Sequence, residues 1–421
     1  MSGILLASSV AEALLAAREA SRALAVATTQ VRNDGLSAIA AALEARAAAV
    51  VEANELDLAN GRENGLASAL LDRLRLDPAR IRALASAVRE IEALPDPVGE
   101  IVRGSTLPNG LRISEVRVPF GVVGIIYEAR PNVTVDLAAL AIKSGNAVVL
   151  RGGRAALHSN RALVDIIQSA LASVGLSDAA VQSIDAFGRE GARELMRARG
   201  LVDVLIPRGS ADLISAVVDE ASVPVIETGA GVVHLFLDES AELESAVDIV
   251  HNSKVQRPSV CNALETLLVH RSAAGRLLPG VLAALRSDGV TIHGDDETIA
   301  LFPDAEPATE DDWASEYLSL DLAVRVVGDL DEALEHIRRY STHHTESILT
   351  NDAANAERFL AEVDSAAVMV NASTRFTDGG EFGFGAEVGI STQKLHARGP
   401  MGLRELTSTK WIVRGSGQVR G

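Results

Sequence analysis

Cysteine is almost absent from the chain, which has one, Cys261, in 421 residues. A single cysteine can form neither an intrachain disulfide nor a thiolate cage around a metal ion. Because no export signal is recognisable either, we expect the reducing cytoplasm as the compartment. The chain is also poor in positive charge: 39 Lys and Arg face 57 Asp and Glu, a formal net charge of −18. That balance argues against nucleic-acid and membrane partners.

Aromatic residues and long apolar runs are scarce as well. Aromatics make up 3% of the residues against 48% for all hydrophobic types, a composition typical of an Ala/Val/Leu-rich globular α/β protein. No apolar run is long enough to cross a membrane. The apolar residues 1–20 carry acidic side chains and lack a basic start, which predicts an amphipathic helix and not a signal peptide.

Signatures for two common kinds of site are missing. No GxGxxG motif follows an expected strand, so the usual dinucleotide fingerprint is absent. The nearest approach to a metal motif is the group His336, His343 and His344. The adjacent pair points in divergent directions in most backbones, and no third ligand has a suitable spacing. We therefore predict no metal site.

The chain up to Pro95 shows the three-to-four-residue apolar period of helices. We expect a helix that Asp77 caps, and before it helices over residues 11–28, 36–52 and 67–76. A hairpin is expected next, with Asn109-Gly110 at the turn between residues 101–106 and 111–118. Its second arm alternates polar and apolar residues, which indicates an exposed or intersubunit strand.

From Gly121 onward, short apolar segments alternate with helical ones, which predicts parallel, doubly wound sheets. The first set of strands is expected at residues 122–127, 147–150, 181–184, 202–206 and 223–226. The second set is expected at residues 234–237, 265–269, 289–292, 323–327, 347–349 and 367–370. Ligands of such sheets bind at the carboxyl ends of the strands.

Three of these strand ends carry glycine-rich turns, namely Arg151-Gly152-Gly153-Arg154, Arg208-Gly209-Ser210 and the segment from Glu227 to Gly231. Glycines let backbone N–H groups approach a phosphate, and two guanidiniums can hold one. The alternative for the first turn is an ordinary βα connection with solvated arginines, and for the second a plain capped turn. Glu227 is either a general base or a solvated strand-end residue.

Cys261 follows Gln256, Arg257 and Pro258, which break regular structure, and it precedes an apolar strand. A thiol on such a turn, beside a guanidinium, is where a lowered thiolate pKa is expected. The alternative is a small buried hydrophobic residue. Asn132 is well placed to cap the helix expected over residues 133–144, or to donate to an oxyanion beside the thiol.

Collinear blocks of sequence give the chain a resemblance to the aldehyde dehydrogenase superfamily. They are PFGVVGIIYEARPNVT at 119–134, KSGNAVVLRGG at 143–153, ETGAG at 227–231, QRPSVCN at 256–262, and further blocks at 335–348, 382–391 and 396–411. The resemblance implies two doubly wound α/β domains and a small β arm used for homo-oligomerisation. The implied boundaries are residues 1–100 and 120–233 for an NADPH-binding domain, 234–403 for a catalytic domain, and 101–119 with 404–421 for the arm.

Carried over residue by residue, the resemblance implies that Cys261 is the nucleophile and Asn132 an oxyanion donor. The superfamily asparagine stands two positions earlier, where this chain has Arg130, so Asn132 fills the role only in a differently shaped loop. Arg130 and Arg375 are the candidates for binding anionic groups of the substrate. The candidates on the cofactor side, from the strand ends and the resemblance together, are Lys143, Arg151, Gly152, Gly153, Arg154, Arg208, Gly209, Ser210, Glu227, Gly229, Glu316 and Phe384.

The superfamily often has Lys-Pro-Ser-Glu where this chain has the turn from Arg151 to Arg154. Loss of the glutamate that binds ribose hydroxyls, with gain of Arg154, favours a 2′-phosphate and hence NADPH. The blocks resemble most the branch that reduces L-glutamyl 5-phosphate to glutamate 5-semialdehyde, through a cysteine thioester, in proline biosynthesis. A phosphate-independent aldehyde dehydrogenase and a noncatalytic nucleotide-binding protein are the alternatives. A glutamate 5-kinase that hands over the labile substrate is a further partner to consider.

Overall fold

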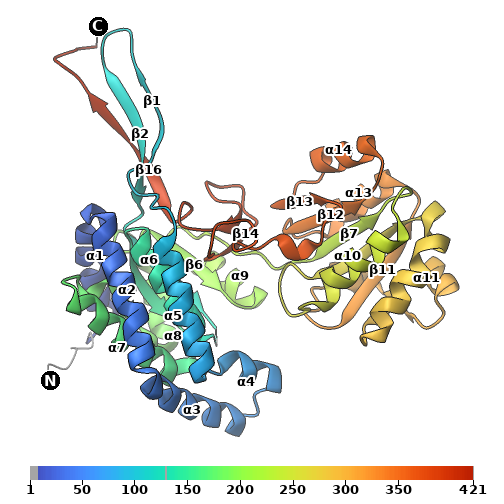
Figure 1. The fold of residues 1–421 in the computed structure, drawn as a ribbon, viewed down its shortest axis with the longest axis horizontal. Helices are drawn as coiled ribbons and strands as arrows, with labels where there is room; N and C mark the ends of the chain where they lie inside the picture. The colour runs from blue at the N-terminus through green and yellow to red at the C-terminus, as the bar shows by residue number, and fades with distance from the viewer. Residues whose placement is uncertain (1–7, 129, 421) are drawn as a thin grey trace. The chain divides into compact units, whose positions relative to one another are not determined.

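The chain divides into two compact units in the computed structural model, which describes residues 8–128 and 130–420. The outermost residues of the predicted domains, 1–7 and Gly421, lie outside the described residues, as does Ala129 of the 119–134 block. Unit 1 comprises Met1–Glu227, Gly383–Gly389 and Met401–Gly421, and unit 2 comprises Thr228–Phe382 and Ile390–Pro400 (Figure 1). Within the described residues no helix combines the length and apolarity needed to cross a membrane.

Helices fill the amino-terminal part of unit 1, as the apolar period predicts. They are α1 (Val10–Val26), α2 (Thr29–Ala45), α3 (Ala47–Glu63), α4 (Ser68–Leu74) and α5 (Pro78–Ala93). Asp77 accepts from the Arg80 N–H at the start of α5, so the predicted cap is confirmed. The prediction of one helix over residues 36–52 is wrong. Arg46 leaves the helical conformation with φ −110° and separates α2 from α3, although the alanine-rich pattern continues across the break.

A parallel sheet with strand order β5-β4-β3-β6 forms the core of unit 1. Its strands are β3 (Val122–Tyr127), β4 (Ala147–Arg151), β5 (Val181–Ser183) and β6 (Val204–Arg208). The connecting helices are α6 (Pro131–Lys143), α7 (Leu157–Ser173), α8 (Gly188–Arg197) and α9 (Ala211–Glu220), with 3-10 turns at Arg154–Ala156, Asp178–Ala180 and Asp185–Phe187. The strand predicted at residues 223–226 is wrong, because that segment contributes only an isolated bridge from Val225 to Leu205.

A separate antiparallel sheet in unit 1 joins the predicted hairpin to the end of the chain. β1 (Ile101–Thr106) and β16 (Thr407–Arg414) flank β2 (Arg112–Pro119), so the outer strands come from distant parts of the sequence (Figure 1). Gly110 takes φ +87° in the connection between β1 and β2, which a residue with a side chain rarely adopts. Both outer strands expose apolar side chains, including Ile101, Trp411 and Val413.

Unit 2 contains a parallel sheet of order β10-β9-β11-β8-β7-β12-β13. The strands are β7 (Val233–Leu237), β8 (Leu264–His270), β9 (Thr291–Gly294), β10 (Glu306–Pro307), β11 (Asp321–Val327), β12 (Thr345–Leu349) and β13 (Ala367–Val370). The helices are α10 (Leu243–Val255), α11 (Arg271–Ser287), α12 (Asp296–Leu301), α13 (Leu330–Tyr340) and α14 (Ala353–Glu362), with 3-10 turns η4 (Glu310–Ala314) and η5 (Thr374–Phe376). Short strands β14 (Gly389–Ser391) and β15 (Gly399–Met401) lie where the chain passes between the units.

A buried aromatic cluster in unit 2 surrounds the His336 ring. Trp313, Tyr340 and His234 have ring centroids within 5.6 Å of it, and the Arg325 guanidinium donates to its Nδ1 at 3.1 Å. Burial lowers the pKa of His336 to about 2, with the neighbouring His234 and Arg325 acting in the same direction. His336 is therefore neutral in the folded protein under all but strongly acidic conditions.

We predict that His336 makes the protein sensitive to mild acid. Its pKa is lower in the folded than in the unfolded chain, so the unfolded chain binds more protons below pH 6.5 and stability falls as pH falls. Between pH 8 and pH 5, the unfolding free energy should drop about 2 kcal/mol more in the unmodified protein than in His336→Phe. Denaturant titrations at both pH values measure this. Equal drops in the two proteins would contradict the prediction.

Candidate active site

Cys261 lies on the loop between α10 and β8, as predicted, and is half-buried. The next residue fastens this loop to η5. The Asn262 amide donates to the Thr377 carbonyl at 2.8 Å, and the Asn262 carbonyl accepts from the Thr374 hydroxyl at 2.8 Å. The residue that follows the thiol is therefore held through both its side chain and its backbone carbonyl.

Gly231 touches the thiol loop from the other side. A Cβ atom at this position would lie 1.6 Å from the Cys261 carbonyl oxygen, so only glycine fits. The Gly231 N–H donates to Glu316 Oε1 at 2.7 Å. Burial raises the pKa of Glu316, and the Gly231 hydrogen bond opposes that shift. Cys261, Gly231 and Glu316 thus lie together within unit 2.

Arg375 lies in the electrostatic surroundings of the thiol, and Arg257 lies in those of Arg375. Arg375 donates from Nε to the Gln256 amide oxygen at 2.7 Å, which holds it against the start of the loop. Burial lowers the pKa of Arg375, and the Arg257 charge acts in the same direction, whereas Asp378 and Cys261 act in the opposite one. Positive charges near a thiol favour its thiolate form.

The Arg151 turn lies at the carboxyl end of β4, as predicted, but its first glycine is already engaged. The Gly152 N–H donates to Asp185 Oδ1 at 2.5 Å, and a Cβ at Gly152 would lie 2.1 Å from the Asn160 amide nitrogen. The prediction that Gly152 offers its N–H to a phosphate is therefore wrong for this conformation. Gly153 follows in extended conformation, and Arg154 is exposed. The buried Nε of Arg151 lacks a hydrogen-bond partner among the described residues.

The Arg208-Gly209-Ser210 turn begins α9, and Ser210 caps that helix by accepting from the Leu213 N–H. A carboxylate occupies the turn, because Glu128 accepts from the Ser210 N–H at 3.0 Å and from its hydroxyl at 3.1 Å. Gly209 is close-packed against the same carboxylate. Arg208 donates to the Val388 carbonyl. These contacts are those of a capped turn, the alternative that the sequence left open.

Asn132 does not cap α6. The helix begins at Pro131 with Arg130 in the cap position and no side-chain cap, and the Asn132 amide instead reaches Asp136 Oδ2 at 3.4 Å. The proline explains the shift, since its fixed φ suits the first helical position and moves the start one residue earlier. Burial raises the pKa of Asp136 to about 6, against the Asn132 hydrogen bond.

Lys143, the cofactor-side candidate that comes first in the chain, lies away from the Arg151 turn. Lys143 ends α6 at the amino end of β4, whereas Arg151 stands at the carboxyl end. Its Nζ donates to the Asn33 side chain at 2.8 Å and to the Glu92 carbonyl at 2.5 Å. Burial lowers its pKa. Lys143 joins α6 to the amino-terminal helices.

The other cofactor-side candidates lie on loops of both units. Gly229 donates to the Ile390 carbonyl at 3.2 Å, and a Cβ there would lie 2.4 Å from Thr392. Glu227, at the end of the first segment of unit 1, is half-buried. Phe384 exposes 42% of its surface on the glycine-rich loop.

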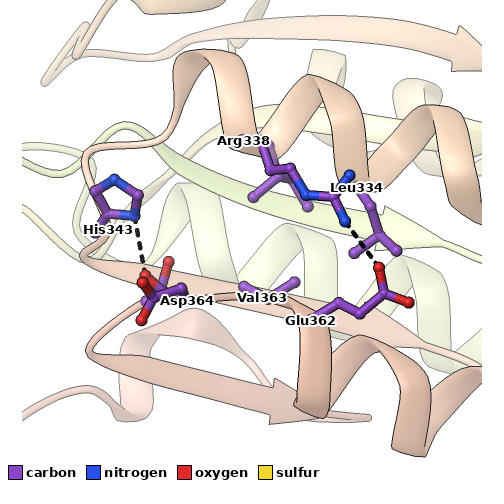
Figure 2. A pocket seen from close by; sticks show the side chains of 8 residues that line it. Leu334, Arg338, His343, Glu362, Val363 and Asp364 are labelled. Atoms are coloured by element: carbon purple, nitrogen blue, oxygen red, sulfur yellow. Dashed lines mark hydrogen bonds and ion pairs between the residues drawn. The ribbon is translucent and has the colours of Figure 1, made fainter.

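The three histidines that come nearest to a metal motif in the sequence lie in different environments. His344 is buried beside Thr345, and burial lowers its pKa to about 4. His343 has φ +62° and hydrogen-bonds the Asp364 carbonyl beside a cavity of about 40 Å³ between α13 and α14, which the Arg338–Glu362 ion pair borders (Figure 2). That volume holds a few water molecules and no substrate.

Sequence reasoning missed the carboxylates that organise these turns. Asp185 directly follows the strand expected at 181–184, and Glu128 follows the strand expected at 122–127. A carboxylate at the carboxyl end of a parallel strand was therefore an available signal. It also missed the fully buried pair of Lys254 and Glu265, which flanks the thiol loop. No pattern in the sequence pairs those two residues.

Known proteins resemble the chain over its whole length. A model described as "Aldehyde dehydrogenase family" matches residues 6–302. A gamma-glutamyl phosphate reductase of Clavibacter michiganensis is 69% identical over 408 residues, 97% of this chain and 94% of that protein. The crystal structure of gamma-glutamyl phosphate reductase from Thermotoga maritima is 50% identical with a TM-score of 0.96, covering 98% of this chain and 100% of that one.

More distant structures share the architecture. An acetylating aldehyde dehydrogenase from Geobacillus thermoglucosidasius matches with a TM-score of 0.72 at 19% identity, covering 98% of this chain and 97% of that one. The predicted fold class, an aldehyde dehydrogenase-like α/β protein, is thereby confirmed. The chain therefore belongs to the aldehyde dehydrogenase family, and within that family of oxidoreductases to the gamma-glutamyl phosphate reductases.

Proposed function

We propose that the protein reduces L-glutamyl 5-phosphate to L-glutamate 5-semialdehyde with NADPH and releases phosphate, as a step of proline biosynthesis. The observation that carries the proposal is the arrangement at Cys261. The thiol lies on a firmly held loop, Gly231 packs against its backbone, and Arg375 and Arg257 supply positive charge. The printed names of the close relatives point to the same substrate.

In the proposed reaction the Cys261 thiolate attacks the acyl carbon, the bond from carbon to the phosphate oxygen breaks, and phosphate leaves. NADPH, when bound, supplies the hydride that reduces the resulting thioester. The carbonyl of the thiohemiacetal oxyanion re-forms as the carbon–sulfur bond breaks, which releases the aldehyde and restores the thiolate; the one proton of the overall reaction is taken up by the leaving phosphate. The oxyanion forms twice, and its donors are the Cys261 N–H and Asn132. Arg130 and Arg375 bind the anionic groups of the substrate.

The cofactor side of the proposal rests on Arg154 and Arg151. Arg154 is exposed beside the strand end, and the unpartnered buried Nε of Arg151 is a donor suited to a phosphate oxygen. Glu316 and Phe384 are assigned to the nicotinamide end. Glu227 is assigned to cofactor contact and not to base catalysis, because water attack on the thioester would waste the intermediate.

We predict that the reverse reaction requires phosphate. The enzyme with glutamate 5-semialdehyde and NADP⁺ should form NADPH only when phosphate is present, because phosphate must attack the thioester to release the product. Chloride at equal ionic strength is the control. Cys261→Ala should reduce the rate to background. Turnover that ignores phosphate would contradict the reductase proposal in favour of a phosphate-independent dehydrogenase, and an active Cys261→Ala variant would contradict the role of the thiol.

We predict that Arg154 selects NADPH over NADH. In Arg154→Ser, kcat/KM for NADPH should fall roughly 10- to 100-fold, the effect of losing one charge-assisted hydrogen bond. The value for NADH should stay within about twofold, since NADH lacks the 2′-phosphate. Arg197→Ser, which removes an exposed guanidinium at the end of α8, is the matched control. An unchanged ratio of the two cofactors in Arg154→Ser would refute the assignment.

We propose further that the sheet of β1, β2 and β16 carries a homo-oligomer contact, because its outer strands expose backbone and apolar side chains. Trp411 and Val413 of β16 are 51% and 56% exposed. The double variant Trp411→Asp/Val413→Asp should therefore sediment at a lower mass than the unmodified protein. Val419→Asp, at a position 87% exposed beyond β16, should sediment as the unmodified protein does. An unchanged mass in the double variant would exclude this contact.

A cytoplasmic location and docking of a glutamate 5-kinase stay predictions. An acyl phosphate hydrolyses readily in water. This lability is a chemical reason for the kinase to transfer its product directly to the reductase.

A further inference from the structure

A buried ion pair closes the base of the thiol loop. Lys254, in the last turn of α10, and Glu265, in β8, are both fully buried, and Lys254 Nζ lies 2.6 Å from Glu265 Oε2. Residues 256–263, which include Cys261, run between the two elements that the pair joins. Lys254 and Glu265 thus fix the distance between the two ends of the loop.

The second oxygen of the same carboxylate holds the segment that follows Glu316. The Leu318 N–H donates to Glu265 Oε1 at 3.2 Å. Leu318 has φ +55°, a conformation that costs energy for a residue with a side chain. The hydrogen bond to Glu265 helps to hold this turn two residues after Glu316. One carboxylate therefore links the thiol loop to the Glu316 segment.

Glu316 is linked to the thiol loop through Gly231. Its carboxylate accepts from the Gly231 N–H at 2.7 Å, and Gly231 packs against the Cys261 carbonyl. The contacts form a closed ring that runs from the thiol loop through Glu265 and the Glu316 segment to Gly231 and back. Every member belongs to unit 2.

We propose that Glu265, with Lys254 as its counterion, is a positioning residue that sets the thiol loop and the Glu316 segment in one geometry. The inference rests on the proposed function for the roles of Cys261 and Glu316. Stability alone explains the pair poorly, because desolvation offsets much of the attraction between buried charges and hydrophobic replacements are often neutral. Burial raises the pKa of Glu265 to about 7 and lowers that of Lys254, which reflects that desolvation. A displacement of about 1 Å at reacting groups, in contrast, can cost about 100-fold in rate.

Two double variants distinguish the ion pair of Lys254 and Glu265 from the hydrogen bond between Leu318 and Glu265. Lys254→Met/Glu265→Gln removes both charges but leaves an amide oxygen to accept from Leu318. Lys254→Met/Glu265→Leu removes that acceptor as well. We expect kcat to fall roughly 10- to 100-fold in both. The KM for NADPH should stay within about twofold in the first and rise severalfold in the second, which frees the Glu316 segment.

Alkylation of Cys261 by iodoacetamide gives a second readout that needs neither substrate nor cofactor. Its midpoint pH should move upward in both variants, because a loosened loop carries the thiol away from Arg375. Circular dichroism and thermal unfolding show that each variant is folded. Arg271→Met/Glu297→Gln, which removes an exposed bidentate pair elsewhere in unit 2, is the matched control and should change none of these quantities.

Folded double variants with unchanged kcat, KM and alkylation midpoint would overturn the inference. Hydrogen exchange of the unmodified protein tests the same point without any variant: the Leu318 amide and the amides of residues 256–263 should open with a common free energy. Separate openings would also overturn it. A shifted alkylation midpoint in a protein that never reduces the acyl phosphate would refute the proposed function and leave the positioning role intact.

Discussion

The approach of Gly231 to the Cys261 carbonyl is the constraint on which the thiol loop of unit 2 depends. A side chain at Gly231 would collide with the backbone of Cys261, so the two loops can meet only through glycine. The contact brings the Gly231 N–H to Glu316, and Asn262 anchors the same thiol loop to η5. A side chain on a loop is ordinarily mobile. In this unit, neighbouring backbone surrounds it, so its position follows from packing and not from the conformation of the loop alone.

Buried polar groups fix the relative positions of strands and loops in unit 2. The sheet core is formed by apolar side chains, but Lys254, Glu265, His234 and Glu346 lie fully buried where strands and loops meet. Such groups cost desolvation energy unless each finds a partner, and partners have direction. A hydrophobic contact tolerates sliding, whereas a hydrogen bond or ion pair at 2.6 Å does not. The precise relative positions of strands and loops in unit 2 therefore depend on its buried polar groups.

Much of the fold was predictable because apolar residues recur along the sequence with a clear helical or strand period. Buried strands such as β3 and β4 are short apolar runs, and Asp77-Pro78 marks a helix start by its chemistry. The errors arose where the local pattern is neutral. The break at Arg46 lies within continuous alanine-rich periodicity, and residues 223–226 have a strand composition without a strand partner beyond one bridge.

The candidate site was predictable to a different degree. The loop position of Cys261 follows from Pro258, which cannot continue the helix that precedes it. The positions of Lys143 and of the Gly152 N–H depend on tertiary partners, Asn33 and Asp185, that lie far away in sequence. Periodicity carries no information about such pairs. Lys143 and the Arg151 turn, which belong to one block of sequence, therefore lie at opposite ends of β4.

The two occupied turns of unit 1 change how an anionic cofactor must be recognised. Asp185 and Glu128 take the N–H groups that glycine-rich turns usually offer to phosphate, and each adds a negative charge at a strand end. In a chain of net charge −18, that field repels a phosphate. Binding must then come from side chains, and the guanidiniums at the same strand ends are Arg151, Arg154 and Arg208. A guanidinium keeps its charge at any physiological pH and donates in a fixed plane, so it can offset the carboxylates and, in the proposed function, bind the 2′-phosphate. Specificity on this side of the protein is consequently assigned to arginine side chains, with the glycines serving close packing.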